Sequence, residues 1–154
     1  MRERGFSVEI FDGTFSDGID DFAAKLAESC PRVVGITAVQ PNRETALNLA
    51  EIAHNAGATV ILGGPDPTSN PEVYLQNHVV DIIVHHEGEL TLVELLGTLL
   101  VRESYQPKIK TIEGIAYRDL QRVFCPVGMP VKARSDTEIA ISIVAELIRA
   151  RHCS

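Results

Sequence analysis

The chain has 154 residues, 45% of them hydrophobic, and a formal net charge of -7 at pH 7. This length is enough for one domain whose apolar core needs neither disulfide nor metal, and the acidic balance argues against nucleic acid and anionic membranes as partners. The three cysteines, Cys30, Cys125 and Cys153, lie far apart. Their spacing excludes a zinc ribbon or an iron–sulfur loop within the chain and suits the reducing cytoplasm. We expect neither a membrane-spanning segment nor a signal peptide, because no apolar stretch has the required length.

Strand and helix patterns alternate along most of the chain. In chain order, they predict a strand over 7–11, a helix over 19–29, a strand over 32–37, a helix over 41–56, a strand over 58–62, a short helix over 71–77, a strand over 79–84 and a helix over 89–102. Gly57 is the expected stop of the second helix, and Ser69 with Glu72 reads as a capping box before the third. Short apolar strands separated by helices indicate an α/β fold, with a flavodoxin-like or Rossmann-like, mostly parallel sheet and helices on both faces.

The pattern changes after Pro107. Two strands over 112–118 and 122–124 predict a hairpin appended to the sheet edge. A closing helix is predicted over 137–151, although the alternation over 139–144 also suits a strand. We therefore divide the chain into an α/β domain over 1–106 and an extension of hairpin and helix over 107–154.

Three segments follow the predicted parallel strands and mark the edge where ligands of such sheets bind: 37–40, 63–70 and 85–88. In the second segment, Gly63 and Gly64 let a ligand approach the backbone where a Cβ would block it. The prolines that follow stiffen the loop. This density of special residues predicts a ligand rim, and the alternative is a tight turn used for packing alone.

Several side chains along this edge have competing interpretations. Thr37 is a ligand contact or a strand-end hydroxyl that caps the next helix, and Asp66 is a ligand contact or a solvated loop carboxylate. Nitrogen and oxygen donors also follow one another closely in His85, His86, Glu87 and Glu89. Because adjacent histidines on an extended segment point to opposite faces, we assign no metal ligand there. The chain contains no motif for a catalytic triad, a phosphate loop or a dinucleotide-binding loop, so no catalytic residue is assigned.

Four sequence motifs carry a family resemblance. They are Val33-Val34-Gly35-Ile36-Thr37, Gly63-Gly64-Pro65-x-Pro67-Thr68 with Pro71-Glu72, Asp81-x-x-Val84 leading into Glu87-Gly88-Glu89, and Glu113-Gly114-Ile115-Ala116-Tyr117-Arg118. With them the chain resembles, from about Gly5 to Phe124, the cobalamin-binding domain at the N-terminus of many radical S-adenosylmethionine (SAM) enzymes. The Gly-Gly-Pro-x-Pro-Thr and Glu-Gly-Glu elements are fairly specific together and weak separately.

The resemblance implies cobalamin as the cofactor. In that family the double glycine lets the nucleotide loop of the corrin pass into the domain, which implies this role for Gly63 and Gly64. A small hydroxyl residue lies beside that loop, and here it is Thr37. The other residues implied at the cofactor are Ala38 and Val39 along the channel, Pro65 and Asp66 in the loop, and Thr68, Glu87, Gly88 and Glu89 bordering the corrin face.

The chain departs from the family pattern in both loops. Asp66 stands where the family usually has histidine, and His86 stands where it usually has the first glycine of Gly-Glu-Gly-Glu. We expect a side chain at that turn to strain a backbone that needs positive φ, by roughly 1 kcal/mol or somewhat more. The Asp-x-His-x-x-Gly motif of related domains does not occur, so we assign no cobalt ligand.

The family also begins with a strand and a helix before the strand over 7–11. This chain starts at Met1-Arg2-Glu3-Arg4, which resembles the end of that helix. In a doubly wound sheet the missing strand is internal, and its loss leaves two inward edges unpaired. Three explanations stay open: the chain is a fragment of a longer protein, its C-terminal segment closes the gap, or a second copy exchanges a strand in a homodimer.

These patterns support three hypotheses about function. The leading one is a cobalamin-binding module that orients the corrin for methyl transfer or rearrangement on a radical SAM catalytic domain, in cis or in trans. The iron–sulfur cluster and S-adenosylmethionine would belong to that partner domain, so we expect the chain alone to catalyse nothing. The alternatives are an interaction or sensor domain without a cofactor, and a small α/β enzyme with Asp66, His86 and Glu87 as acid–base groups.

Overall fold

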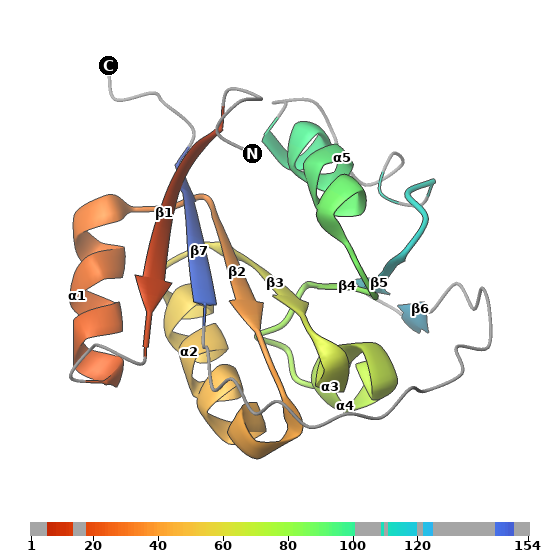
Figure 1. Ribbon diagram of the computed structural model, residues 1–154, viewed down its shortest axis with the longest axis horizontal. Helices are drawn as coiled ribbons and strands as arrows, with labels where there is room; N and C mark the ends of the chain where they lie inside the picture. The colour runs from red at the N-terminus through yellow and green to blue at the C-terminus, as the bar shows by residue number, and fades with distance from the viewer. Residues whose placement is uncertain are drawn as a thin grey trace.

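A computed structural model describes residues 6–13, 18–100, 109, 111–119, 122–124 and 144–149. Its elements, in chain order, are β1 (Ser7–Asp12), α1 (Ile19–Ser29), β2 (Val33–Thr37), the 3-10 turn η2 (Gln40–Asn42), α2 (Arg43–Asn55), β3 (Thr59–Gly63), α3 (Pro65–Ser69), α4 (Pro71–Leu75), β4 (Ile82–Val84), α5 (Glu89–Leu100), β5 (Ile115–Asp119), β6 (Arg122–Phe124) and β7 (Val144–Arg149). Figure 1 shows their arrangement. The predicted alternation of strands and helices is confirmed.

The strands of the described chain form one sheet in the order β1-β7-β2-β3-β4-β5-β6. β2, β3 and β4 run parallel, in a register that pairs Thr37 with Gly63 and Ile61 with Ile82. Their carboxyl ends therefore lie along one edge, and the segments that follow them meet there. The hairpin of β5 and β6 extends the sheet beyond β4 in antiparallel pairing, as predicted. The α/β, flavodoxin-like architecture expected from the sequence is thus confirmed.

The C-terminal strand β7 lies between β1 and β2, antiparallel to both, and is drawn in dark blue in Figure 1. The helix predicted over 137–151 is therefore wrong for residues 144–149, and the rest of that range lies outside the described residues. The physical reason is that β1 and β2, joined through α1, each present an inward row of backbone donors and acceptors that needs partners. Ile148 pairs with Val8 on one side and with Val33 on the other. A C-terminal strand occupies the internal position, as one of the three explanations predicted.

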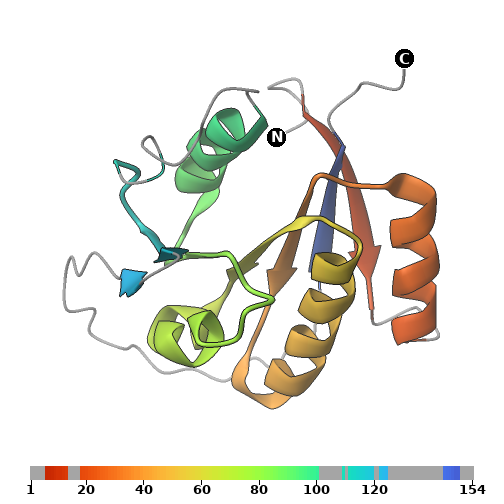
Figure 2. The same ribbon diagram turned by 180° about the vertical axis from the view of Figure 1, so that it is seen from behind.

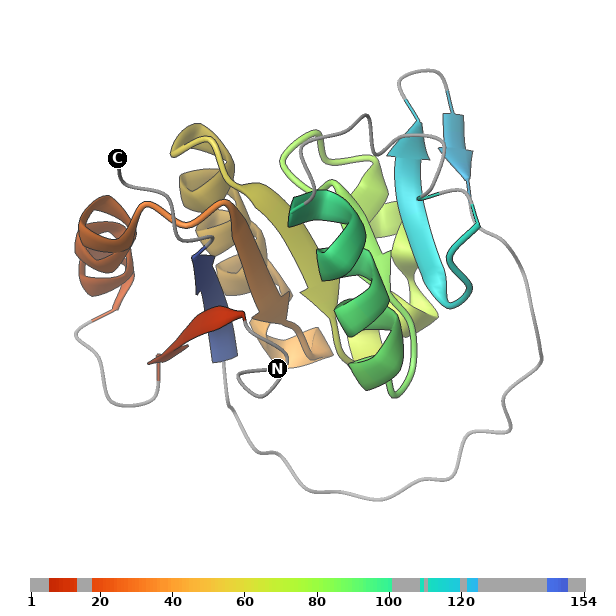
Figure 3. The same ribbon diagram turned by 90° about the horizontal axis from the view of Figure 1, so that it is seen from above.

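The two faces of the sheet are covered by different helices. On one face α1, α2 and α4 pack together, and Phe22, Leu49 and Tyr74 belong to a single core cluster there. On the other face α5 packs alone among the described helices, with Leu95 and Leu96 in a second cluster. Figures 2 and 3 show α2 and α5 on opposite sides of the sheet. Within the described residues, no helix has the length and apolar character needed to cross a membrane.

Two predictions about helix ends had different outcomes. Gly57 follows α2 with a φ of 83°, and its N–H donates back to the last turn of that helix, so the predicted stop is confirmed. The capping box of Ser69 with Glu72 is not formed. Ser69 ends the short helix α3 instead, and Asn70, which precedes α4, makes no side-chain cap. The loop is helical earlier than the sequence pattern indicated.

Candidate functional site

A cavity of about 520 Å³ lies between the sheet and α5, at the carboxyl ends of β2, β3 and β4. The strands contribute Gly35, Ile36, Thr37, Ile61, Leu62, Gly63 and Val84, the turns contribute Gly64, His86 and Gly88, and α5 contributes Glu89, Leu90, Leu92 and Val93. Most of these residues are apolar. This is the place where a parallel sheet of this kind binds its ligand.

Two glycines create the space above the sheet. The parallel register pairs Gly35 with Ile61 and Thr37 with Gly63, and Ile61 belongs to the cluster on the α5 side. Because paired residues of parallel strands share a face, Gly35 and Gly63 leave that face bare where the cavity lies. A Cβ built on Gly63 would have only the Val84 carbonyl oxygen within 4 Å, at 3.8 Å. A side chain at Gly63 would therefore enter the cavity without displacing the backbone.

Gly64 is needed for a different reason. Its φ of 102° lies in a region that L side chains rarely adopt. A Cβ on Gly64 would also lie 2.6 Å from the Ala38 carbonyl oxygen and 3.1 Å from Thr37 Cγ2. The turn from β3 into α3 thus presses against the end of β2, and the Ala38 N–H donates to the Gly63 carbonyl at 2.9 Å. A substitution at Gly64 would change the fold, whereas one at Gly63 would change the cavity.

The turn from β4 into α5 forms the opposite rim. His86 has a φ of 56°, so the positive φ expected at this position is confirmed. Its N–H donates to Thr68 Oγ1 at 3.2 Å, which ties the turn to α3. Gly88 lies against β4, because a Cβ there would lie 2.0 Å from Val84 Cγ1. Burial, followed by the charge of His86, lowers the pKa of His85. This shift favours the neutral form of the His85 imidazole.

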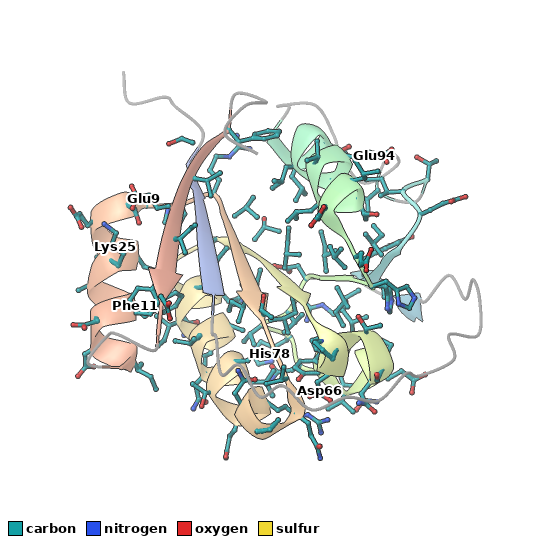
Figure 4. All side chains as sticks on the ribbon, viewed as in Figure 1. Glu9, Phe11, Lys25, Asp66, His78 and Glu94 are labelled. Carbon is teal, nitrogen blue, oxygen red and sulfur yellow. The ribbon has the colours of Figure 1, made fainter. Side chains whose placement is uncertain are left out.

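Asp66 is buried, so its interpretation as a solvated loop carboxylate is wrong. Its side chain is 3% exposed. Arg43 Nε and Nη2 donate to its two oxygens at 2.8 and 2.6 Å, Asn70 Nδ2 donates at 2.9 Å, and the Tyr74 hydroxyl donates as well. The bonds from Arg43, assisted by those from Tyr74 and Asn70, hold the pKa of Asp66 at about 2 against the opposing effect of burial. Figure 4 labels Asp66, a residue of α3, in the lower part of the view.

The structure gathers part of the predicted site around the cavity. Five predicted residues line it: Thr37, Gly63, Gly64, Gly88 and Glu89. The predicted residues that do not line it are Ala38, Val39, Pro65, Asp66, Thr68 and Glu87. Of the residues that do not line the cavity, Val39 lies in the loop after β2, where its N–H donates to Asn42 Oδ1 at 2.8 Å.

Among the residues that the sequence analysis did not assign to the site, Gly35 and Arg43 shape it most directly. Gly35 lies inside an apolar strand. An isolated glycine within a strand can indicate that another group approaches the backbone closely or that a side chain is left out, and this sign was present in the sequence. Arg43 had no comparable signal, because its partner Asp66 is 23 positions away and the bond depends on the fold. Both act at the carboxyl edge, one in the floor of the cavity and the other behind its rim.

The geometry does not suit acid–base catalysis by Asp66, His86 and Glu87. Of these three residues, His86 alone lines the cavity, and Asp66 is held by Arg43. Among the residues that the structure describes, no group of three or more His, Cys, Asp or Glu side chains could hold a metal ion. The site instead offers a chamber lined mostly by apolar residues, which suits the binding of an apolar group.

Comparison with known proteins identifies the family of this fold and cavity. The family model of the B12 binding domain matches residues 1–96, more than half of the chain. The chain is 33% identical over 127 residues to an uncharacterised methyltransferase of Pyrococcus horikoshii, which covers 80% of this chain and 27% of that protein. It is 28% identical over 105 residues to the 2-(S-pantetheinyl)-carbapenam-3-carboxylate methyltransferase of Streptantibioticus cattleyicolor, which covers 66% of this chain and 15% of that protein. No solved structure matches the chain.

The chain therefore spans about a quarter or less of the length of these curated relatives. The family match covers every strand and helix that forms the cavity, from β2 to the middle of α5. The chain belongs to the B12-binding domain family, and its cofactor is cobalamin.

Proposed function

We propose that this domain holds cobalamin with its nucleotide arm in the cavity and its corrin ring outside, at the carboxyl edge of the sheet. The observation that carries the proposal is the bare floor formed by Gly35 and Gly63, a hollow that a Cβ on Gly63 would enter. The cavity volume of about 520 Å³ lies within the range of roughly 300–1,000 Å³ that is typical of small-molecule sites. Apolar walls suit an aromatic base.

Each group of predicted residues takes a part in this arrangement. Thr37, Gly63 and Gly64 line the cavity and would lie beside the arm at its entrance. The backbone of Ala38, Val39 and Pro65 supports that entrance from the adjoining loops, and Thr68 with Glu87, Gly88 and Glu89 would border the ring. Asp66 acts indirectly, from behind the rim, through the bonds it makes with Arg43 and Tyr74.

When bound, cobalamin supplies a cobalt–carbon bond that can carry a methyl group. The contribution of this chain is to bind the cofactor, to orient it and to exclude water from its arm. Both relatives are named as methyltransferases, which supports methyl transfer over rearrangement. The resemblance supports a radical SAM domain, in cis or in trans, as the place where the iron–sulfur cluster and S-adenosylmethionine act.

The surroundings of the domain are part of the same proposal. Three cysteines without paired spacing suit a reducing cytoplasm. The division into 1–106 and 107–154 stays a prediction, and β5, β6 and β7 join the sheet of the first part. Strand exchange between two copies also stays a prediction, which size-exclusion chromatography of the purified chain would test.

A titration with hydroxocobalamin tests the binding. The purified chain should retain one cofactor after desalting, followed by visible absorbance. Dicyanocobinamide, which has the corrin ring but no nucleotide arm, should bind at least about tenfold more weakly if the cavity takes the arm. Retention of neither compound by the folded chain would contradict the proposed function. Equal affinity for both would contradict the assignment of the arm to the cavity.

A further inference from the structure

We propose that Arg43 is a positioning residue of the cavity, which through Asp66 holds the loops that form the rim. Arg43 is the first residue of α2, and Asp66 lies in α3, so their bidentate pair joins two elements at the carboxyl edge. Neither residue lines the cavity. The identity of the ligand in the cavity rests on the proposed function. The role of these contacts in positioning the rim does not depend on it.

Asp66 connects the ion pair to the rim through the backbone around it. Its own N–H donates to the Ala38 carbonyl at 3.4 Å, at the end of β2. Two residues on, the Thr68 N–H donates to the Gly64 carbonyl at 3.1 Å, and Thr68 Oγ1 accepts the N–H of His86. The loop that contains Asp66 is thus bonded to Ala38 after β2, to Gly64 after β3 and to His86 after β4, and the last two of these residues line the cavity.

The loop depends on side-chain bonds for its shape. α3 has five residues, and a helix this short is not stable by itself in water. Besides the bonds to Ala38 and from His86, the Asp66 carboxylate connects α3 to Arg43 on α2 and to Tyr74 on α4. The planar fork of Arg43 fixes the orientation of the carboxylate as well as its position, which a lysine could not do.

The buried carboxylate of Asp66 also requires a positively charged partner. Arg43 is about one third exposed, and its guanidinium lies over the Tyr74 ring, 5.8 Å from the centroid. Without Arg43, the Asp66 carboxylate would be buried with no opposite charge, which is strongly destabilising. The arginine therefore accounts for the aspartate that stands where the resembling family usually has histidine.

The test compares variants with a matched control in the ligand-free and cobalamin-loaded chain. Arg43→Met removes the fork, Arg43→Lys keeps the charge, and Arg43→Met with Asp66→Asn removes the buried charge so that the fold is retained. Lys25→Met is the control, because Lys25 pairs with Glu9 on α1 and β1, away from the cavity (Figure 4). The first measurement is amide hydrogen exchange at Thr68 and His86, with the Val60 amide, bonded to Asp81 Oδ2, as the internal reference.

We expect exchange at Thr68 and His86 to rise about tenfold in the folded Arg43→Met and double variants, with Val60 unchanged and Arg43→Lys intermediate. The dissociation constant for hydroxocobalamin should rise about tenfold in parallel, and Lys25→Met should match the wild type in both measurements. Unchanged exchange at the rim, or exchange that rises equally at Val60, would overturn the positioning role. If the wild type binds no cobalamin, the proposed function fails, and the exchange data still decide whether Arg43 positions the rim.

Discussion

The two faces of the sheet are built from the same strands but are packed differently. On the face covered by α1, α2 and α4, strand residues such as Val34, Val60 and Ile83 are fully buried. On the face covered by α5, the corresponding positions near the carboxyl edge include Gly35 and Gly63, and a cavity remains. The filled face provides the stability, and the hollow face provides the binding site.

This difference shows how one sheet can serve both purposes. Close packing on the filled face leaves no room for a ligand, and every methylene removed from it costs stability. On the hollow face, glycine removes bulk within a strand while the backbone ladder stays intact. The site is therefore a local omission of side chains on one face of the sheet.

The largest expected effect lies on the filled face. Leu49 is 3% exposed within the cluster of that face. Leu49→Ala should lower the free energy of unfolding by about 2–5 kcal/mol, because it leaves a void in a packed core. Chemical denaturation measures this loss. The affinity of the folded fraction for hydroxocobalamin should not change, and a weakened affinity would break the separation of the two faces.

Asp66 gives a pH-dependent effect of intermediate size. Hydrogen bonds from Arg43 lower the pKa of Asp66 from 3.8 to about 2. The ionised Asp66 therefore contributes about 2 kcal/mol to the free energy of unfolding above about pH 5. This contribution is lost as the pH falls from about 4 to 2, because the carboxyl takes up its proton in the unfolded state first.

Acid unfolding curves of the wild type and of Asp66→Asn measure this contribution. The variant should lose about 2 kcal/mol less than the wild type between pH 5 and pH 2. Equal losses in the two proteins would mean that Asp66 is not held by Arg43 in solution. The bond from Tyr74 to Asp66 would then not connect the core of the filled face to the rim of the cavity.

The smallest expected effect lies at the rim of the hollow face. His86 adopts a φ of 56°, so His86→Gly should raise the free energy of unfolding by up to about 1 kcal/mol by relieving strain. Gly88→Ala in the same turn should have the opposite sign, because its Cβ would lie 2.0 Å from Val84 Cγ1. Thermal unfolding of both variants checks the pair. Destabilisation by His86→Gly would show that this turn carries no strain.

Local patterns in the sequence predicted most of the fold. The bounds of α1 follow from its helical periodicity, the hairpin of β5 and β6 from its turn, and the end of α2 from Gly57. The positive φ at His86 was expected from the family resemblance, because that family usually has glycine at this position. In the site, the segments after β2, β3 and β4 were predicted because parallel strands place their carboxyl ends along one edge.

Features that depend on distant contacts were predicted in part or not at all. Closure of the gap between β1 and β2 by a C-terminal segment was one of three open explanations, but the helix predicted over residues 144–149 considered local spacing only. The bond between Arg43 and Asp66 joins α2 and α3, which are far apart in the sequence and meet at the carboxyl edge of the sheet. Gly35 was visible in the sequence, yet its effect required knowledge of which face of β2 carries α5.

The most direct measurement is the affinity of Gly63→Val for hydroxocobalamin, beside that of the wild type, by equilibrium titration. A side chain at Gly63 has open space at the backbone and would occupy the cavity. We predict one cofactor per wild-type chain, and binding at least about a hundredfold weaker in the variant with little change in its unfolding temperature. Wild-type affinity in a folded Gly63→Val chain would contradict the assignment of cobalamin to this cavity.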